Sequence, residues 1–149
     1  MNPKEFLLLN LAVAFYSVGA IWAHEVDIFR SWKQLDPETF HRVQRVHWRK
    51  LPYWVFAPII LSLMGSIALL WYHPADSPAW IVWAPLCCQL LTHLGTATLW
   101  GPWQAKLSQD PSGAASLYLA RFLSTHWIRT VLVNLNGLIL LVWAVRALA

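Results

Sequence analysis

The 149-residue chain is 58% hydrophobic and only 12% charged, whereas soluble domains average about 25% charged residues. This composition, with 11 Trp residues, excludes an ordinary soluble domain and favours a single membrane domain over residues 1–149. Eleven basic and seven acidic residues give a formal charge of +4. In so apolar a chain, that excess favours anionic lipid head groups as partners over nucleic acid.

A first membrane-spanning helix is predicted over about residues 5–25, because Phe6 to Ala23 carry no charge. The sequence AVA at 12–14 resembles a signal-peptide cleavage site. The apolar run continues nine residues beyond it, which favours an uncleaved span. The polar residues of this span share one helical face at a seven-residue spacing, namely Asn10, Ser17 and His24, and Glu25 follows directly.

The next predicted element is an amphipathic helix in the segment between the first two spans. Asp36 is placed to cap its N-terminus, and Pro37 suits the first helical position. One face would carry the apolar residues and a histidine: Phe40, Val43, His47 and Leu51. The opposite face and the end of the helix are basic: Arg42, Arg45, Arg49 and Lys50. We expect this helix to lie on the inner membrane surface and to bind lipid head groups, and a lid over a cavity is the alternative.

Three more membrane-spanning helices are predicted, over about residues 51–72, 78–102 and 122–147. Each contains the roughly 20 apolar residues that a crossing needs. The continuous apolar runs lack the alternation of a membrane β-barrel. The predicted fold is therefore an all-α, polytopic membrane protein, a bundle of four transmembrane helices with an amphipathic cytoplasmic helix between spans one and two.

The distribution of basic residues among the loops predicts the orientation of this bundle. Lys and Arg are concentrated between spans one and two and between spans three and four, whereas the short loop at 73–78 has none. The positive-inside rule therefore places the first and third loops in the cytoplasm. Both termini are then expected on the outer side of the membrane.

Polar residues on the later spans also follow helical spacing. They are Ser62 and Ser66 in span two, Gln89, His93 and Thr96 in span three, and His126, Thr130, Asn134 and Gly137 in span four. Lipid cannot satisfy such groups, so these faces should turn toward the other helices. Five of the six histidines then gather near the inner leaflet. The predicted pocket residues are His24, Glu25, His93, His126, Arg129 and Asn134.

Two interpretations of these pocket residues remain open. Imidazoles with a carboxylate form a common ligand set for iron and copper, which makes His24, His93 and His126 candidate metal ligands. Haem or a bound quinone or pigment would also suit a helix bundle. The alternative is hydrogen-bonded packing, because no HxxxH, ExxH or HExxH spacing occurs within a span. In that case Asn134 joins helices, and Arg129 contacts phosphate or pairs with Glu25.

Three stretches together resemble a known group of proteins. They are FHRVQRVHWRKLPYWVFAP at 40–58, GTATLWGPWQAKL at 95–107 and STHWIRT at 124–130. They resemble small four-helix bacterial membrane proteins of unknown function, which look distantly related to anthrone-oxygenase-like membrane proteins. The resemblance implies location in the bacterial cytoplasmic (inner) membrane and suggests oxygenation as a reaction. The residues that match the pattern of this group are His41, Arg45, Pro58, Pro102, Trp127, Arg129 and Thr130.

The chain departs from this pattern at three positions. Ser62 or a neighbour stands where the relatives tend to have an acidic residue, and Gln104 stands where they tend to have His. His126 replaces an Asn. The first two changes remove plausible ligands, so whether the chain is an enzyme is left open.

Two functions follow from these observations. The first is an accessory or structural subunit that packs against other membrane proteins or against copies of itself, favoured because the spacing of possible ligands is poor. The second is a binding protein, or an oxygenase-like enzyme, that holds a small hydrophobic molecule beside the inner-leaflet histidines.

Overall fold

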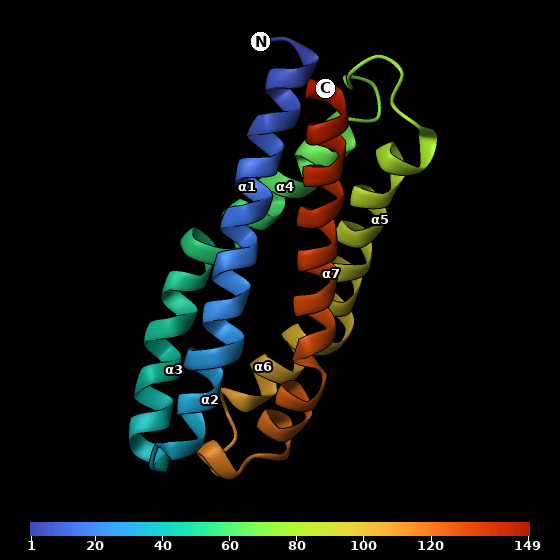
Figure 1. Ribbon diagram of the computed structural model, residues 1–149. Coiled ribbons are helices and arrows are strands. Elements are labelled where there is room, and N and C mark those ends of the chain that lie inside the picture. The colour runs from blue at the N-terminus through green and yellow to red at the C-terminus, as the bar shows by residue number, and fades with distance from the viewer.

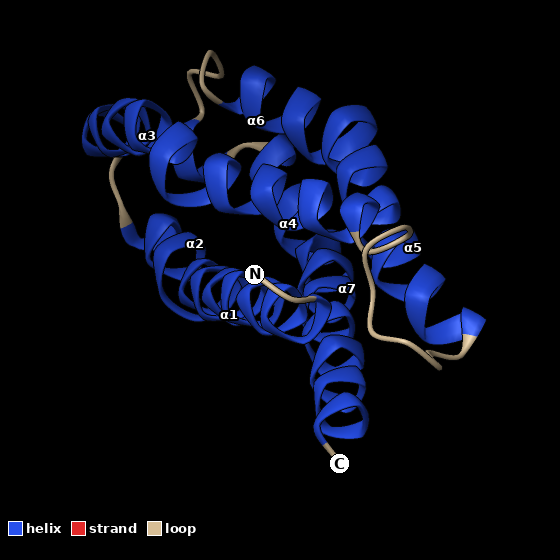
Figure 2. Ribbon diagram, turned by 90° about the horizontal axis from the view of Figure 1, so that it is seen from above, coloured by secondary structure: helices blue, strands red, loops and turns tan.

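The computed structural model describes all 149 residues and contains only helices and loops (Figures 1 and 2). The α-helices are α1 (Pro3–Ala23), α2 (Phe29–Ser31), α3 (Pro37–Leu51), α4 (Ala57–Ala68), α5 (Ala79–Gly95), α6 (Gly101–Leu107) and α7 (Leu117–Leu148). Three π-helical turns interrupt them: η1 (His24–Ile28), η3 (Pro52–Phe56) and η4 (Thr96–Trp100). Two short 3-10 turns are η2 (Trp32–Gln34) and η5 (Gly113–Ala115). The all-α prediction is confirmed.

Three continuous helical stretches are long and apolar enough to cross a membrane. They are Pro3–Gln34, Pro37–Ala68 and Leu117–Leu148, each of 32 residues. The third predicted span, at about residues 78–102, forms one continuous helix from α5 through α6, but it is not among these three candidates. Polar residues such as Gln89 and His93 lower its mean hydropathy. The protein is thus a helical bundle with three candidate spans, and a fourth crossing stays a prediction.

The basic helix α3 differs from its prediction as a separate surface helix. It continues through η3 into α4 as one long helix and extends the bundle at one end (Figure 1). Proline and a π-helical turn are the usual causes of a kink without a break, and η3 begins at Pro52. Other details are confirmed: the Asp36 carboxylate accepts a hydrogen bond from the Thr39 amide at 3.0 Å, and Arg42, Arg45 and Arg49 are exposed.

Two hydrophobic cores hold the helices together. The first joins α1, α5 and α7 and consists of Leu7, Ala14, Leu69, Ile81, Val82, Leu140, Trp143 and Ala144. The second, which is rich in aromatic residues, closes the other end: Phe29, Trp32, Phe40, Trp100, Leu107, Leu119, Phe122 and Leu123. The candidate site lies beside the second core.

The polar faces predicted for the helices do turn inward. Asn10, Ser17, Ser62, Ser66, Gln89 and Thr130 are all buried. The Gln89 amide nitrogen donates to the Ser62 hydroxyl across α5 and α4 at 2.6 Å. Asn10 packs against the backbone of Gly65, where an added Cβ would lie 1.5 Å from the amide oxygen. The Gln89–Ser62 hydrogen bond satisfies polar groups between helices, as a membrane environment requires, whereas the Asn10 amide nitrogen donates to the Phe6 carbonyl of its own helix at 2.8 Å.

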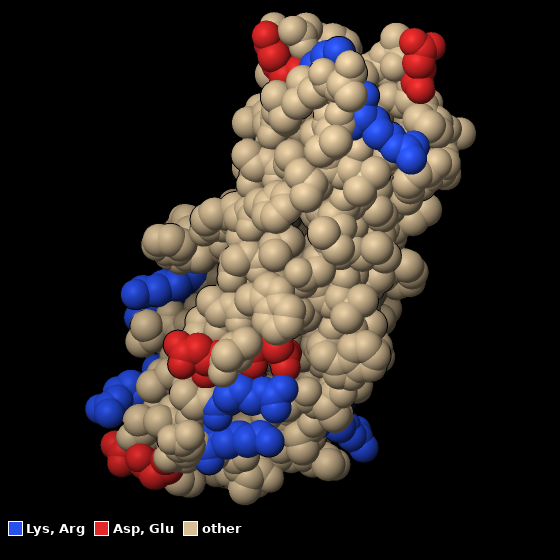
Figure 3. Space-filling view, in the orientation of Figure 1, with Lys and Arg blue, Asp and Glu red and all other residues tan.

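Charged residues lie at the two ends of the molecule and leave the middle bare. Figure 3 shows an uncharged band between a small group of charges near the termini and a larger group around α2 and α3. Such a band is what the hydrocarbon layer of a bilayer requires. The distribution agrees with the candidate spans and with a membrane location.

Candidate functional site

A hydrogen-bonded chain of four side chains joins α2 and η1 to α7 at the charged end of the bundle. Arg30 of α2 donates to Glu25 Oε1 at 2.5 Å, and the ring nitrogen Nδ1 of His126 lies 2.6 Å from Glu25 Oε2. The other ring nitrogen of His126 lies 2.5 Å from Nη2 of Arg129. Glu25, His126 and Arg129 are buried, whereas the side chain of Arg30 is 54% exposed.

The partners fix the protonation of His126. A guanidinium only donates hydrogen bonds, so Nε2 of His126 must accept from Arg129. Nδ1 then carries the ring proton and donates to the Glu25 carboxylate. His126 is therefore neutral in this arrangement. The chain contains two guanidinium charges and one carboxylate, and it has a net charge of +1.

Arg129 is the buried charged residue of this chain that has no direct anionic partner. The residue is only 6% exposed, and its Nε has no hydrogen-bond partner. The Arg30–Glu25 contact is the only ion pair in the protein, because His126, the other partner of Glu25, is neutral. The guanidinium carbon lies 5.5 Å from the centre of the Trp100 ring and 6.0 Å from that of Phe122, which provides cation–π contacts. A buried guanidinium with an unused donor is costly unless an acceptor occupies the space beside it.

All three π-helical turns border this region. The turn η1 begins with His24 and Glu25, and η4 ends with Trp100, the residue that lies over Arg129. The turn η3 contributes Trp54, Val55 and Phe56 to the cavity described next. A π-helical turn shifts the side chains that follow it, and such turns occur frequently at functional sites.

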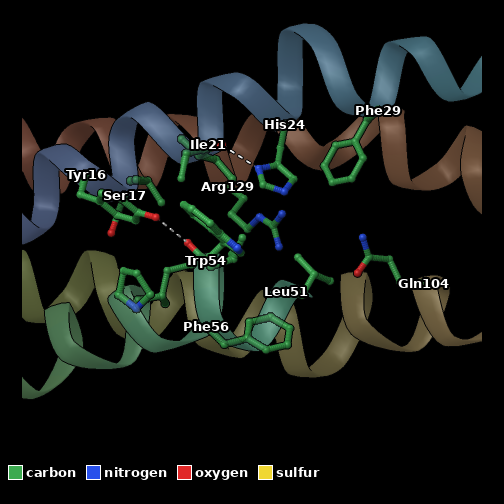
Figure 4. A pocket seen from close by; sticks show the side chains of 15 residues that line it. Tyr16, Ser17, Ile21, His24, Phe29, Leu51, Trp54, Phe56, Gln104 and Arg129 are labelled. Carbon is green, nitrogen blue, oxygen red and sulfur yellow. Dashed lines mark hydrogen bonds between the residues drawn. The ribbon is translucent and has the colours of Figure 1, made fainter. Parts of the chain in front are cut away.

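A small cavity lies beside Arg129, and we call it the inner cavity. Its volume is about 20 Å³. Arg129, His24 and Gln104 give it polar walls, and most of its other lining side chains are hydrophobic. Figure 4 shows the side chains of Arg129 and His24 directed between the helices, with Gln104 at one end. The inner cavity thus places the buried cation next to empty space.

A larger groove adjoins the inner cavity, and we call it the lateral groove. It lies between α1 and the α3–η3 helix and has a volume of about 640 Å³. Hydrophobic side chains form most of its lining, and His47 and Lys50 contribute polar groups. Six residues line both spaces: Tyr16, Ala20, His24, Leu51, Trp54 and Val55. The lateral groove is therefore continuous with the inner cavity.

Comparisons of the chain with protein-family models, curated proteins and solved structures find no match. The resemblance to small four-helix membrane proteins consequently stays a prediction. The site must be understood from its own contacts.

Four of the six predicted pocket residues come together: His24, Glu25, His126 and Arg129. His24 and His126 both pack on the ring of Phe29, with ring centres 5.3 and 4.8 Å from it. His47, predicted on the buried face of the basic helix, lies 5.2 Å from His24 between ring centres. These histidines form one aromatic cluster at the end of the bundle.

His93 and Asn134 lie apart from this cluster. Nδ1 of His93 is hydrogen-bonded to the Gln89 carbonyl at 2.7 Å, and no ring contact joins His93 to the other histidines. The Asn134 amide donates to the Thr130 carbonyl and accepts from the indole nitrogen of Trp22 at 3.0 Å. Asn134 therefore makes the α1–α7 contact that the packing interpretation predicts.

The geometry gives no support to a metal site built from His24, His93 and His126. No group of three or more His, Cys, Asp or Glu side chains is arranged to hold a metal ion. His93 lies apart from the other two, and both ring nitrogens of His126 already have protein partners. Binding of haem, iron or copper by these residues remains a prediction.

Several cavity residues were not predicted from the sequence. Tyr16, Trp54 and Gln104 line the inner cavity, and the Tyr16 hydroxyl donates to the Trp54 carbonyl at 3.3 Å, which joins α1 to η3. One signal was available: Tyr16, Ala20 and His24 are four residues apart on α1 and share a face. Nothing in the sequence indicated that η3 would pack against that face.

Proposed function

We propose that this small helical membrane protein binds a hydrophobic small molecule. The apolar part of the ligand would occupy the lateral groove, and its polar end would reach Arg129 in the inner cavity. The observation that carries the proposal is the buried side chain of Arg129, which has an unpartnered Nε and lines the inner cavity next to an apolar groove. Small-molecule sites combine an apolar concave surface with a few converging polar groups in this way.

The dimensions of the lateral groove agree with this role. Its volume of about 640 Å³ falls within the range of roughly 300–1,000 Å³ that is usual for small-molecule sites. It opens sideways between two helices, so a ligand dissolved in the membrane could enter without passing through water. The side chains at its rim, Tyr16 and Trp54, are partly exposed.

The first prediction concerns Ala20, which lines both the lateral groove and the inner cavity. The substitution Ala20→Phe should fill the junction between them and lower the amount of bound hydrophobic molecule at least about tenfold, because the ring would occupy the ligand's path. The measurement is mass spectrometry of the organic extract from protein purified in a mild detergent, expressed per mole of protein.

Ala12→Phe is the matched control. Ala12 is exposed on the same helix and lines neither space, so this substitution adds an equal ring without blocking the junction. The control should retain the wild-type amount of the molecule. An extract with no enriched small molecule in the wild type, or with the same amount in both variants, would refute the proposed function.

A subunit role is the second candidate, and a separate groove favours it. This α1–α7 groove has a volume of about 530 Å³ and lies on another face of α1. Its lining includes the exposed residues Trp22 of α1 and Trp127, Leu135 and Leu138 of α7. An apolar helix of another membrane protein, or of a second copy, would fit such a surface. Co-purification of a second polypeptide at fixed stoichiometry would support this role, and a lone monomer would count against it.

We further infer that the end of the bundle carrying α3 faces the cytoplasm. The exposed residues Arg42, Arg45, Arg49 and Lys50 would then contact anionic lipid head groups of the inner leaflet. The oxygenase-like reaction that the resemblance implies would need ligands other than His126, since Glu25 and Arg129 already engage both its ring nitrogens.

A further inference from the structure

We infer that the ligand is a monocarboxylate with a single long apolar chain, a fatty-acid-like amphiphile taken from the membrane. This inference rests on the proposed function and names the chemical class that the same site would take. Three features of the site support it: its charge, the size of the inner cavity and the position of the lateral groove between two helices.

The contacts of Arg129 favour an anionic ligand. Glu25 is the only acidic side chain in the hydrogen-bonded chain, and it is shared between exposed Arg30 and neutral His126. Arg129 reaches Glu25 only through His126. A ligand carboxylate beside the guanidinium of Arg129 would give it the direct anionic partner that it lacks. Charge-assisted hydrogen bonds of this kind are stronger than neutral ones.

The size of the inner cavity selects among anions. Its volume of about 20 Å³ compares with the roughly 10–15 Å³ that one water molecule requires. One carboxylate oxygen fits such a space, and a phosphodiester with its glycerol group does not. A quinone carbonyl would also fit, but it is neutral and would leave the charge of Arg129 uncompensated. The amide of Gln104 lines the same cavity and offers the carboxylate a further donor.

The position of the lateral groove indicates one apolar chain. Its lining comes from two neighbouring stretches, Phe15–Ile28 and His47–Val55, so it is a slot between two helices. The Tyr16 hydroxyl bonded to the Trp54 carbonyl bridges these stretches where groove and cavity meet. Figure 4 shows this bridge on the same side of the cavity as Ser17, away from Gln104. A single chain can follow the slot toward Arg129, whereas a two-chain phospholipid cannot.

Equilibrium binding of two radiolabelled probes to the purified protein in detergent at pH 8 tests this inference. Palmitate carries a carboxylate, and hexadecanol has a chain of the same length with a neutral hydroxyl. The wild type should bind palmitate at least about tenfold more tightly than hexadecanol, because only palmitate compensates the charge of Arg129. Arg129→Gln should bring the ratio of the two affinities close to one, because it removes the charge that only palmitate can pair with.

Gln104→Glu provides a second variant that keeps Arg129. The new carboxylate has nearly the shape of the glutamine and would itself occupy the place of the ligand head group beside Arg129. We expect the ratio of palmitate affinity to hexadecanol affinity to fall at least about tenfold relative to the wild type. If Arg129→Gln does not fold, this variant gives the same information.

The outcomes separate the ligand class from the proposed function. Equal wild-type affinities for palmitate and hexadecanol, both reduced by Ala20→Phe, would overturn the carboxylate assignment and leave the proposed function standing. Palmitate binding that is insensitive to both polar variants would also overturn the assignment. If neither probe binds and Ala20→Phe does not change the extract, both proposals fail.

Discussion

Glu25 determines the charge balance of the site, because it accepts from Arg30 and His126 at the same time. It is 7% exposed and is the only carboxylate in the hydrogen-bonded chain. Without its charge, Arg129 would be buried with no anion nearby. Removing one partner of a buried charged network is much more damaging than removing an exposed charge.

Glu25→Gln should therefore destabilise the fold by about 3–5 kcal/mol. The amide cannot compensate the two guanidinium groups, although it keeps the shape of the side chain. The measurement is the thermal unfolding midpoint in detergent. Asp27→Asn removes one negative charge from the same π-helical turn at an exposed position, and it should change stability by less than about 0.5 kcal/mol. Equal shifts for the two variants would contradict the role assigned to Glu25.

The sequence predicted individual residues of the site better than it predicted their partners. A membrane gives buried polar groups few options, so His24, Glu25, His126 and Arg129 could be expected inside the bundle. The distances between them depend on how α1 and α7 are rotated, which spacing along each helix does not determine. His93 shows this limit: it shares the polar pattern, yet its ring is bonded to its own helix.

The π-helical turns are the elements that position the site, and the sequence did not indicate them. Hydrophobic periodicity distinguishes helix from strand but does not resolve one added residue in a turn. Gly101 follows η4, and its amide donates to the Thr96 carbonyl. A Cβ on Gly101 would lie 2.7 Å from that carbonyl oxygen. This glycine is therefore required by the close approach of the backbone.

Gly101→Ala should destabilise the protein by about 1–3 kcal/mol, because the backbone of η4 must move to avoid the new methyl group. Gly19→Ala is the matched control, since nothing lies within 4 Å of a Cβ there. The control should leave stability unchanged or raise it by up to about 1 kcal/mol through better helix propensity. Thermal unfolding measures both variants, and a stable Gly101→Ala protein would show that η4 tolerates the methyl group.

Helix α3 shows where element boundaries could and could not be predicted. Its start at Pro37 followed from the capping pattern, and Phe40 and Leu51 of the predicted apolar face are buried, although Gln44, which was not predicted on that face, is buried as well. Its end did not, because Leu51–Pro52 has the composition of a helix boundary although the helix continues to Ala68. That continuity brings Trp54 and Val55 against α1, where they form one wall of the lateral groove.

At the scale of the whole molecule, the uncharged middle band and the three 32-residue apolar helices support a membrane location (Figure 3). Composition and hydropathy were sufficient to predict this membrane location. Orientation and the fourth crossing depend on the loops and on α5, and both remain predictions. The continuity of the lateral groove with the inner cavity depends on packing among distant segments, so the sequence alone could not reveal it.

Cysteine labelling in intact cells tests the orientation. In a background in which Cys87 and Cys88 are replaced by Ala, we expect Ala75→Cys to react with a membrane-impermeant thiol reagent added outside. Ser112→Cys should react only after the cells are permeabilised. Ala75 and Ser112 are exposed in loops at opposite ends of the bundle. The reverse pattern would invert the predicted topology. Labelling of both positions from outside would show that the segment between them, α5 and α6, does not cross the membrane.

The most direct test of the binding site is an experimental structure of the protein in a lipid nanodisc. We predict elongated non-protein density in the lateral groove between α1 and η3, ending within hydrogen-bond distance of the Arg129 guanidinium. A groove closed by direct packing of Tyr16, Leu51 and Trp54, with Arg129 paired to a protein carboxylate, would contradict the account.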